Sequence, residues 1–475
     1  MNFLSVQFAL FLAIVVPGYY LCASRRRPLF LLLASYAFYI LSSPLAAIGI
    51  FLATAFTFWM GAVIEAGQNE PAGNASRAPM LAAVTLLVLY LSFFKTLAPL
   101  ARALNVDSAS EGWAGVLARN ALLPLGISYY TFKLISYLVD VYWKKIPAER
   151  SFIAFAAYAA FFPQIVAGPI QRSGDFLEQV HKLSPSTEMF RSGLRRMLIG
   201  CFKKAVVADN LGRLMDAAYA APGAAHPSTL LAFYLFPLQL YADFSALTDI
   251  AVGTARLFGI QSPENFYEPF LATSISQYWR RWHMSLTTWL TDYVFLPLRM
   301  ATRSAGNWGL AFSLMTNMIL IGLWHSLSWT FFVFGVLHGF FLIVDALTSK
   351  RRSKFFKTHT GWDRAATWVG PVFTFHLVAL AMVFVRAASL GQAWDVLSRL
   401  RLLRIEDTGI GENETLYALA GLTLWFLAWV SLKLKQRTWS TFTVPAWGRW
   451  AFYYAVIAVI VKYGHNAEGF IYFKF

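Results

Sequence analysis

"NMILIGLWHSLSWTFFVFGVLHGFF", residues 317–341, is an almost unbroken apolar stretch that contains two histidines, His325 and His338. An apolar run of about 20 residues is long enough to cross the hydrocarbon core of a bilayer. Ionisable side chains at that depth are costly, so each is a candidate functional group. At ~100° per residue, one straight helix would place the two histidines about 220° apart. We therefore expect a break near residues 326–328, with only one histidine facing a site.

The composition indicates that the whole chain is a membrane protein. Of 475 residues, 58% are hydrophobic and only 13% are charged, which excludes ordinary soluble domains. The sequence predicts an all-α integral membrane protein in one domain, residues 1–475. Apolar segments lie near residues 3–22, 28–43, 45–65, 80–100, 121–142, 151–170, 229–258, 307–326, 328–347, 365–387, 414–434 and 448–464.

The net charge of +16 does not indicate a nucleic-acid partner, because the basic residues cluster beside apolar segments. Such clusters mark cytoplasmic loops. They occur at Arg25, Arg26 and Arg27, at Lys144 and Lys145, and at Lys350, Arg351, Arg352, Lys354 and Lys357. The first apolar segment is followed, not preceded, by basic residues, so we expect an uncleaved span with its N-terminus outside.

Two segments are more polar than a lipid-facing span. Residues 274–295 carry aromatic residues at three- and four-residue intervals, which predicts one interfacial or re-entrant helix with His283 on it. Residues 172–215 alternate basic and apolar residues at helical spacing, which indicates an amphipathic helix in the cytoplasmic interface. We expect Lys203 and Lys204 of that helix to contact anionic lipid head groups.

A buried histidine is neutral near pH 7 and can accept a proton from a hydroxyl group. The chain has no GxSxG motif and no phosphate-binding loop of the Walker type, and Cys22 and Cys201 show no metal or disulfide spacing. This pattern favours direct acyl transfer to a hydroxyl acceptor, without a metal or bound cofactor. A lone histidine such as His283 is more often a hydrogen-bonded structural residue.

The motifs resemble the membrane-bound O-acyltransferase (MBOAT) family, and within it the bacterial alginate-type polysaccharide O-acetyltransferases. The resemblance rests on seven segments: LLPLGISYYTF (122–132), FFPQIVAGPIQR (161–172), FKKAVVADNL (202–211), QLYADFSALTDIA (239–251), ENFYEPFLATSISQYWRRWHMSLTTWLTDYVFLPL (264–298), GLWHSLSWTFFVFGVLHG (322–339) and FIYFKF (470–475). It implies core motifs at about 120–345, flanked by helices within 1–119 and 346–475. It further implies a ring of about 11 tilted transmembrane helices with re-entrant helices around a central tunnel.

The resemblance also implies roles for individual residues. His325 matches the family's invariant histidine and is expected to be the general base, with His283 as its partner and His338 as a third candidate. Tunnel-lining or donor-binding candidates are Arg280, Arg281, Trp279, Asp243, Gln239, Tyr241, Ser245 and Trp324. Arginine binds phosphate in a bidentate manner, so Arg280 and Arg281 could steer coenzyme A, although interfacial anchoring explains them equally well.

The expected activity is transfer of an acyl group, favoured as acetyl from acetyl-CoA, across the bacterial inner membrane. The acceptor would be an exported polysaccharide hydroxyl or a partner extracytoplasmic acetyltransferase, and membrane lipids would surround the protein. Three alternatives stay open at this point: D-alanyl transfer from a carrier protein, a transporter and a non-catalytic scaffold. A transporter would show repeated halves in its hydropathy, and the sequence shows no such repeat.

Overall fold

The computed structural model describes residues 3–68, 77–103, 125–219, 229–400, 423 and 445–464, and within those ranges the chain is helical and contains no strand. The chain groups into two compact units, each built from several stretches of sequence. Unit 1 comprises Met1–Leu194, Ala251–Glu264 and Ser285–Val294, and unit 2 comprises Arg195–Ile250, Asn265–Met284 and Phe295–Phe475. The single-domain expectation stays a prediction.

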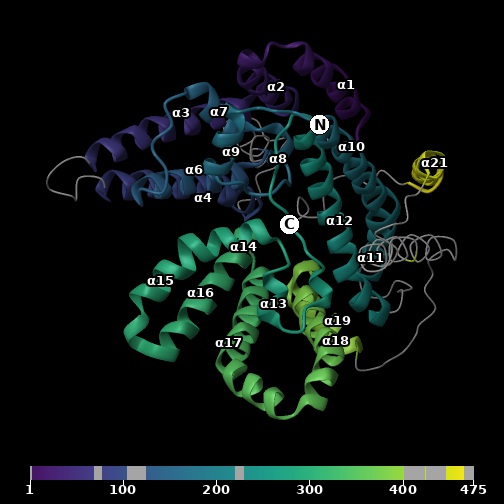
Figure 1. The fold of residues 1–475 in the computed structure, drawn as a ribbon. Coiled ribbons are helices and arrows are strands. Elements are labelled where there is room, and N and C mark those ends of the chain that lie inside the picture. The colour runs from purple at the N-terminus through teal and green to yellow at the C-terminus, as the bar shows by residue number, and fades with distance from the viewer. Residues whose placement is uncertain are drawn as a thin grey trace. The chain divides into compact units, whose positions relative to one another are not determined.

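Unit 1 is built from its N-terminal helices, of which α3, α4 and α6 lie side by side in Figure 1. The helices that begin in this unit are α1 (Val6–Leu21), α2 (Arg27–Ser42), α3 (Pro44–Gly67), α4 (Arg77–Ala103), α6 (Ile127–Tyr142), α7 (Phe152–Ala160), α8 (Phe162–Ile165), α9 (Ser173–His181) and α10 (Thr187–Phe202). Capping residues and prolines set several of these starts. Ser5 and Ser151 accept backbone N–H bonds at the first turns of α1 and α7, and Pro44 opens α3.

The interior of unit 1 contains hydrogen-bonded polar groups. Lys133 on α6 is only 2% exposed, and its Nζ donates to the Tyr158 carbonyl at 2.5 Å and to Gln164 Oε1 at 3.1 Å. Gln164 in turn donates to Gln171 at 2.5 Å and to Ser262 at 2.7 Å. These bonds show that the polar, proline-containing segments around α6 and α8 face protein, where the backbone groups freed by broken helices can find partners.

Unit 2 contains most of the helices after Leu194. Its segments are a π-helical turn (Lys203–Ala208), α11 (Asp209–Ala218), α12 (Thr229–Leu257), α13 (Ile275–Trp279), α14 (Met284–Leu290), α15 (Leu296–Ala301), α16 (Gly306–His325), α17 (Trp329–Thr358), α18 (Thr360–Arg386), α19 (Leu390–Leu400) and α21 (Ala446–Tyr463). Helices α12 and α14 each begin in this unit and continue into unit 1, and a second π-helical turn (Thr291–Phe295) follows α14.

The antiparallel pair α16 and α17 brings the quoted stretch together (Figure 1). The predicted break is confirmed, because α16 ends at His325 and α17 begins at Trp329, with the Ser328 side chain capping its first turn. Glycines allow the two backbones to approach closely: a Cβ on Gly322 would lie 2.2 Å from the Phe331 carbonyl oxygen. A side chain at this position would force the helices apart.

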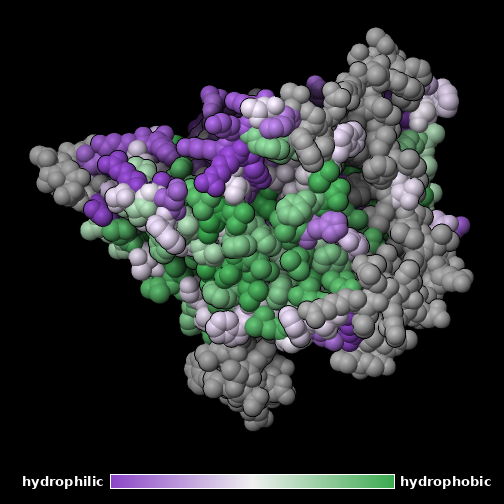
Figure 2. Space-filling model, turned by 90° about the horizontal axis from the view of Figure 1, so that it is seen from below, coloured by the Kyte–Doolittle hydropathy of each residue, from purple (hydrophilic) through white to green (hydrophobic). Residues whose placement is uncertain are grey.

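Five described helices are long and apolar enough to cross a membrane, and they include most of α3, α4, α16, α17 and α18. Together with the family established below, they make this a multi-pass membrane protein. The other expected spans contain helices, although the one expected at 151–170 is interrupted between α7 and α8 and ends at Ile165. Residues 414–434, apart from residue 423, and the motif at 470–475 lie outside the described residues. Large exposed apolar side chains, such as Leu52, Leu89, Trp308, Trp368 and Phe373, agree with a lipid-facing surface, and hydrophobic residues dominate much of the face shown in Figure 2.

Candidate active site

The helix predicted across residues 274–295 is broken at His283, so that prediction is wrong in this respect. α13 ends at Trp279 and α14 begins at Met284, and His283 between them has a φ of +44°. A non-glycine residue in the left-handed region is held there by its surroundings. The Asn265 carbonyl accepts the Met284 N–H at 2.8 Å and the Arg281 carbonyl accepts the Tyr267 N–H at 3.0 Å, which ties the bend to the preceding loop.

The bend turns the His283 ring into the interior of unit 2. Its side chain is 1% exposed, and neither ring nitrogen has a hydrogen-bond partner among the described residues. Burial lowers the pKa of His283 to about 3, so its imidazole is neutral at pH 7. A neutral imidazole with both nitrogens available can accept one proton and donate another.

The structure brings His283 and His325 together. Their ring centroids lie 6.5 Å apart, and both rings pack edge-on against Trp324, at 6.1 Å from His283 and 4.7 Å from His325. Phe244 of α12 also packs against His283, with their ring centroids 4.7 Å apart. Aromatic rings surround the two imidazoles. At this separation, one small bound acyl or hydroxyl group could contact both of them.

His338 has a different environment. It is fully buried, and its Nδ1 accepts a hydrogen bond from Trp279 Nε1 at 3.2 Å. Because an indole N–H only donates, neutral His338 must carry its proton on Nε2. Phe331 and Phe334 stand between it and His325, with successive ring separations of 6.1, 6.3 and 4.7 Å along the row. His338 therefore anchors α13 beside the histidine pair.

The expectation that Lys203 and Lys204 contact lipid is wrong. Lys204 is 3% exposed, and its Nζ lies 2.6 Å from Asp209 and 2.9 Å from Asp243. Lys203 lies 2.5 Å from Asp249. Both lysines lie in the π-helical turn. The wider turn rotates the side chains relative to an α-helix, so the lysines point at α12 and not at the surface.

The four candidate site residues on α12 have different environments. Asp243 serves as an ion-pair partner, and Ser245 accepts a hydrogen bond from Lys203 at 3.1 Å. Tyr241 packs its ring against Phe270 at 5.5 Å and Trp282 at 6.1 Å. Gln239 is 5% exposed, and its Oε1 has no hydrogen-bond partner among the described residues, so it remains the α12 candidate with a free polar atom.

The two arginines next to the bend are more exposed than the histidines. Arg280 is exposed and Arg281 is half-buried, with Arg281 Nη1 donating to the Glu268 carbonyl at 3.3 Å. Arg281 also lies over the Tyr267 ring at 5.7 Å from its centroid. Arg281 thus helps to hold the loop that supports His283. The guanidinium group of Arg280 is exposed at the surface of the protein.

Sequence reasoning missed the residues that shape the bend. Phe244, Asn265 and Phe331 all contact or support the two histidines. Asn265 is fully buried, which is unusual for an amide, and its Nδ2 lies 3.4 Å from Thr248 Oγ1. An asparagine in the loop that precedes α13 was a possible signal, but the sequence does not reveal the positive φ at His283.

Comparisons with known proteins now define the family. The family described as MBOAT, membrane-bound O-acyltransferase, matches residues 145–385, which include both histidines of the pair. The probable alginate O-acetylase of Azotobacter vinelandii is 36% identical over 391 residues, covering 81% of this chain and 74% of that protein.

Two further relatives act on other cell-envelope polymers, according to their names. The peptidoglycan O-acetyltransferase of Helicobacter pylori is 32% identical, covering 58% of this chain and 56% of its own. The teichoic acid D-alanyltransferase of Streptococcus thermophilus is 28% identical, covering 56% of this chain and 66% of its own. The chain belongs to the membrane-bound O-acyltransferase family, and its activity class is acyl transfer.

Proposed function

We propose that this protein transfers an acetyl group from a cytoplasmic thioester, acetyl-CoA, to a hydroxyl acceptor, with His325 as the general base. The observation that carries the proposal is the pairing of His283 and His325 at a ring separation of 6.5 Å inside an acyltransferase of this family. Both histidines belong to unit 2, so the pair does not depend on how the two units are arranged.

In the proposed reaction, the acceptor oxygen attacks the thioester carbonyl carbon while the imidazole of His325 takes the hydroxyl proton. The resulting tetrahedral intermediate collapses, the C–S bond breaks, and the thiolate takes the proton back from the imidazolium. The products are an ester and a free thiol, so no metal or redox cofactor is required. A positioned general base contributes a factor of ~10²–10⁴ in rate, and holding both substrates together must supply much of the rest.

His283 would orient the donor carbonyl or the acceptor hydroxyl. Its burial keeps it neutral, and its left-handed backbone fixes the ring direction before any substrate binds. Arg280, which is exposed beside the bend, is the arginine with a charge available for the phosphates of coenzyme A. Gln239 and Trp324 would contact the same space from α12 and α16.

For the acceptor, we propose a hydroxyl of an exported polysaccharide, reached directly or through an extracytoplasmic acetyltransferase. Support comes from the names of the relatives, which modify alginate and peptidoglycan. The corresponding location is the bacterial inner membrane, with the donor on the cytoplasmic side. The basic clusters around Arg25, Lys144 and Lys350 support that orientation.

Thiol release from acetyl-CoA by purified protein in nanodiscs, with an added polysaccharide or water as the hydroxyl acceptor, tests the donor and the base together. Wild type should release thiol, and His325→Ala should lose nearly all of that release, with His283→Ala reduced to an intermediate rate. His359→Ala is the matched control, because His359 is an exposed histidine in unit 2 outside the site. Equal rates in wild type and His325→Ala, with both proteins folded, would refute the proposed base.

The second candidate function is D-alanyl transfer from a carrier protein, which the 28% identity to a teichoic acid D-alanyltransferase favours. The same histidines would serve, and only the donor would change. If wild type releases no thiol from acetyl-CoA but deacylates a D-alanyl carrier protein, the donor assignment falls and the histidine assignment stands. A transporter or scaffold would instead keep its activity in cells when His325 is replaced by alanine.

A further inference from the structure

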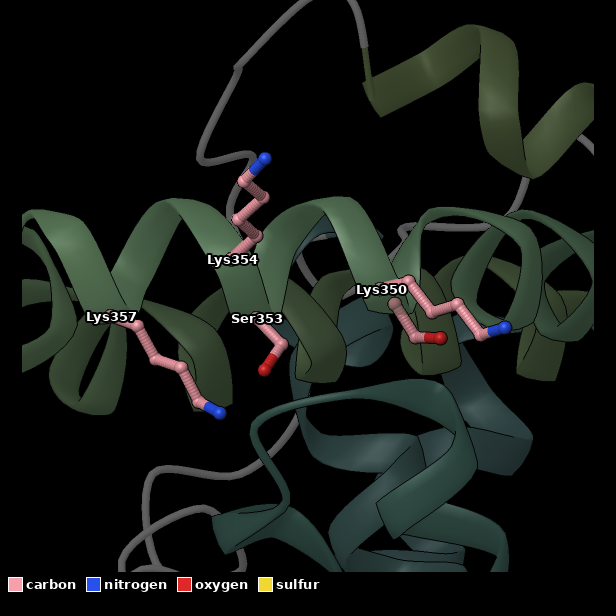
Figure 3. Close-up of a pocket in the computed structure, with 5 residues that line it drawn as sticks. Lys350, Ser353, Lys354 and Lys357 are labelled. Atoms are coloured by element: carbon pink, nitrogen blue, oxygen red, sulfur yellow. The ribbon is translucent and has the colours of Figure 1, made fainter.

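The C-terminal end of α17 carries a row of exposed cations that the proposed reaction does not use. Lys350, Lys354 and Lys357, with Ser349 and Ser353, line an open depression on one face of the helix. All five residues are exposed. Their spacing of three and four residues places them along one side of an α-helix (Figure 3). This row of five residues is called the lysine row below.

The length of α17 sets the depth of the lysine row in a membrane. The helix has 30 residues, from Trp329 to Thr358. About 20 residues cross the hydrocarbon core, so a span that begins at Trp329 leaves the core near Thr348. Trp329 is 73% exposed, as expected of a tryptophan at the opposite interface. The lysine row therefore starts where the head-group layer starts and runs roughly 12 Å farther along the helix axis.

The three lysines lack acidic partners in the described part of the chain, where no ion pair involves them. Arg352 differs, because it is paired with Asp345 on the same helix. Like charges three and four residues apart on a helix repel one another. An external anion would relieve that repulsion.

The side chains show which kind of anion fits. In Figure 3 the ammonium groups of Lys350, Lys354 and Lys357 point away from one another. No single small phosphate can contact all three, whereas neighbouring lipid head groups can each contact one. We propose that the lysine row binds the phosphate groups of several anionic phospholipids in the cytoplasmic leaflet, and so fixes the depth of α17 in the bilayer.

Native mass spectrometry of the protein released from nanodiscs tests this proposal. The nanodiscs contain equal parts of phosphatidylglycerol and phosphatidylcholine, and the readout is the ratio of the two lipids retained. Each lysine near an anionic surface changes this ratio by up to roughly fivefold. Lys350→Gln/Lys354→Gln/Lys357→Gln should therefore lose the phosphatidylglycerol enrichment, and replacement of the same lysines by arginine should keep it.

The matched control is Arg25→Gln/Arg26→Gln/Lys144→Gln, which removes three exposed cations from unit 1. This variant should lose less of the enrichment than the lysine-row variant, because its cations lie on two separate segments and do not form one row. An equal loss in both variants would show a general charge effect and overturn the proposal. Inorganic phosphate is added in a separate arm, and stoichiometric binding of phosphate that displaces the lipid would reassign the row to a soluble phosphate ligand. Thermal unfolding confirms that each variant is folded.

Discussion

Replacement of Lys204 by methionine gives the sharpest test of the interior of unit 2. Lys204 Nζ lies between Asp209 and Asp243, at 2.6 and 2.9 Å, and the lysine and Asp209 side chains are each 4% exposed. Burial alone lowers the pKa of Lys204, but the two carboxylates raise it by more, so the amine stays charged. Lys204→Met leaves two buried carboxylates without their shared cation.

Removing one partner of a buried ion pair costs about 3–5 kcal/mol. That loss is large against a typical folding free energy of about 5–15 kcal/mol. Lys182→Met is the matched control, because Lys182 pairs with Glu178 at 3.3 Å while both side chains remain more than 70% exposed. Such exposed pairs contribute about 0–1 kcal/mol.

The assay is reversible unfolding in mixed detergent micelles, followed by circular dichroism at pH 7 and pH 5. Lys204→Met should be much less stable than Lys182→Met at pH 7. Its deficit should shrink at pH 5, because burial without a nearby cation favours the protonated form of a carboxyl group. The triple variant Lys204→Met/Asp209→Asn/Asp243→Asn should recover part of the loss. Equal stabilities for Lys204→Met and Lys182→Met would place Lys204 in the head-group layer and refute this account of unit 2.

Three further predictions follow from single contacts. Burial lowers the pKa of His283 to about 3 in the folded protein, so its imidazole is neutral there. The free energy of unfolding should therefore fall by about 1.4 kcal/mol per pH unit as the pH drops below about 6.5. His283→Gln should flatten that pH dependence, measured by thermal unfolding. Gly322→Ala places a Cβ against a carbonyl oxygen of α17 at 2.2 Å and should lower the unfolding midpoint, whereas Gly391→Ala, with 3.7 Å of clearance, should not. Trp279→Phe removes the donor to His338 Nδ1 and should lower the free energy of unfolding by about 1–3 kcal/mol. A double-mutant cycle with His338→Phe should give a coupling energy of about 1 kcal/mol between the two residues. Strictly additive effects of the two substitutions would exclude this hydrogen bond.

The sequence was sufficient for the membrane class, most of the helix positions and the break after His325. Each of these follows from strong local signals: apolar runs of span length, and a serine pair that interrupts one of them and caps the next helix. The pairing of His283 with His325 was also predicted, through the family resemblance. The helix count of the ring and the tunnel stay predictions.

Two features could not be read from the sequence because they depend on tertiary contacts. Helical periodicity across residues 274–295 is intact in the sequence, yet loop contacts from Asn265 bend the chain at His283. The pattern of basic and apolar residues around Lys203 and Lys204 matches that of an interfacial helix. A single π-helical turn and carboxylates on α12 and α11 instead make that face an interior one.

The central claim is that His325 carries the proton in acyl transfer, and the rate of thiol release from acetyl-CoA by His325→Gln tests it most directly. Glutamine retains hydrogen bonding but cannot accept the proton, so the rate should fall by ~10²–10⁴ relative to wild type, with unfolding behaviour unchanged. A His325→Gln protein that is folded and releases thiol at the wild-type rate would contradict the claim.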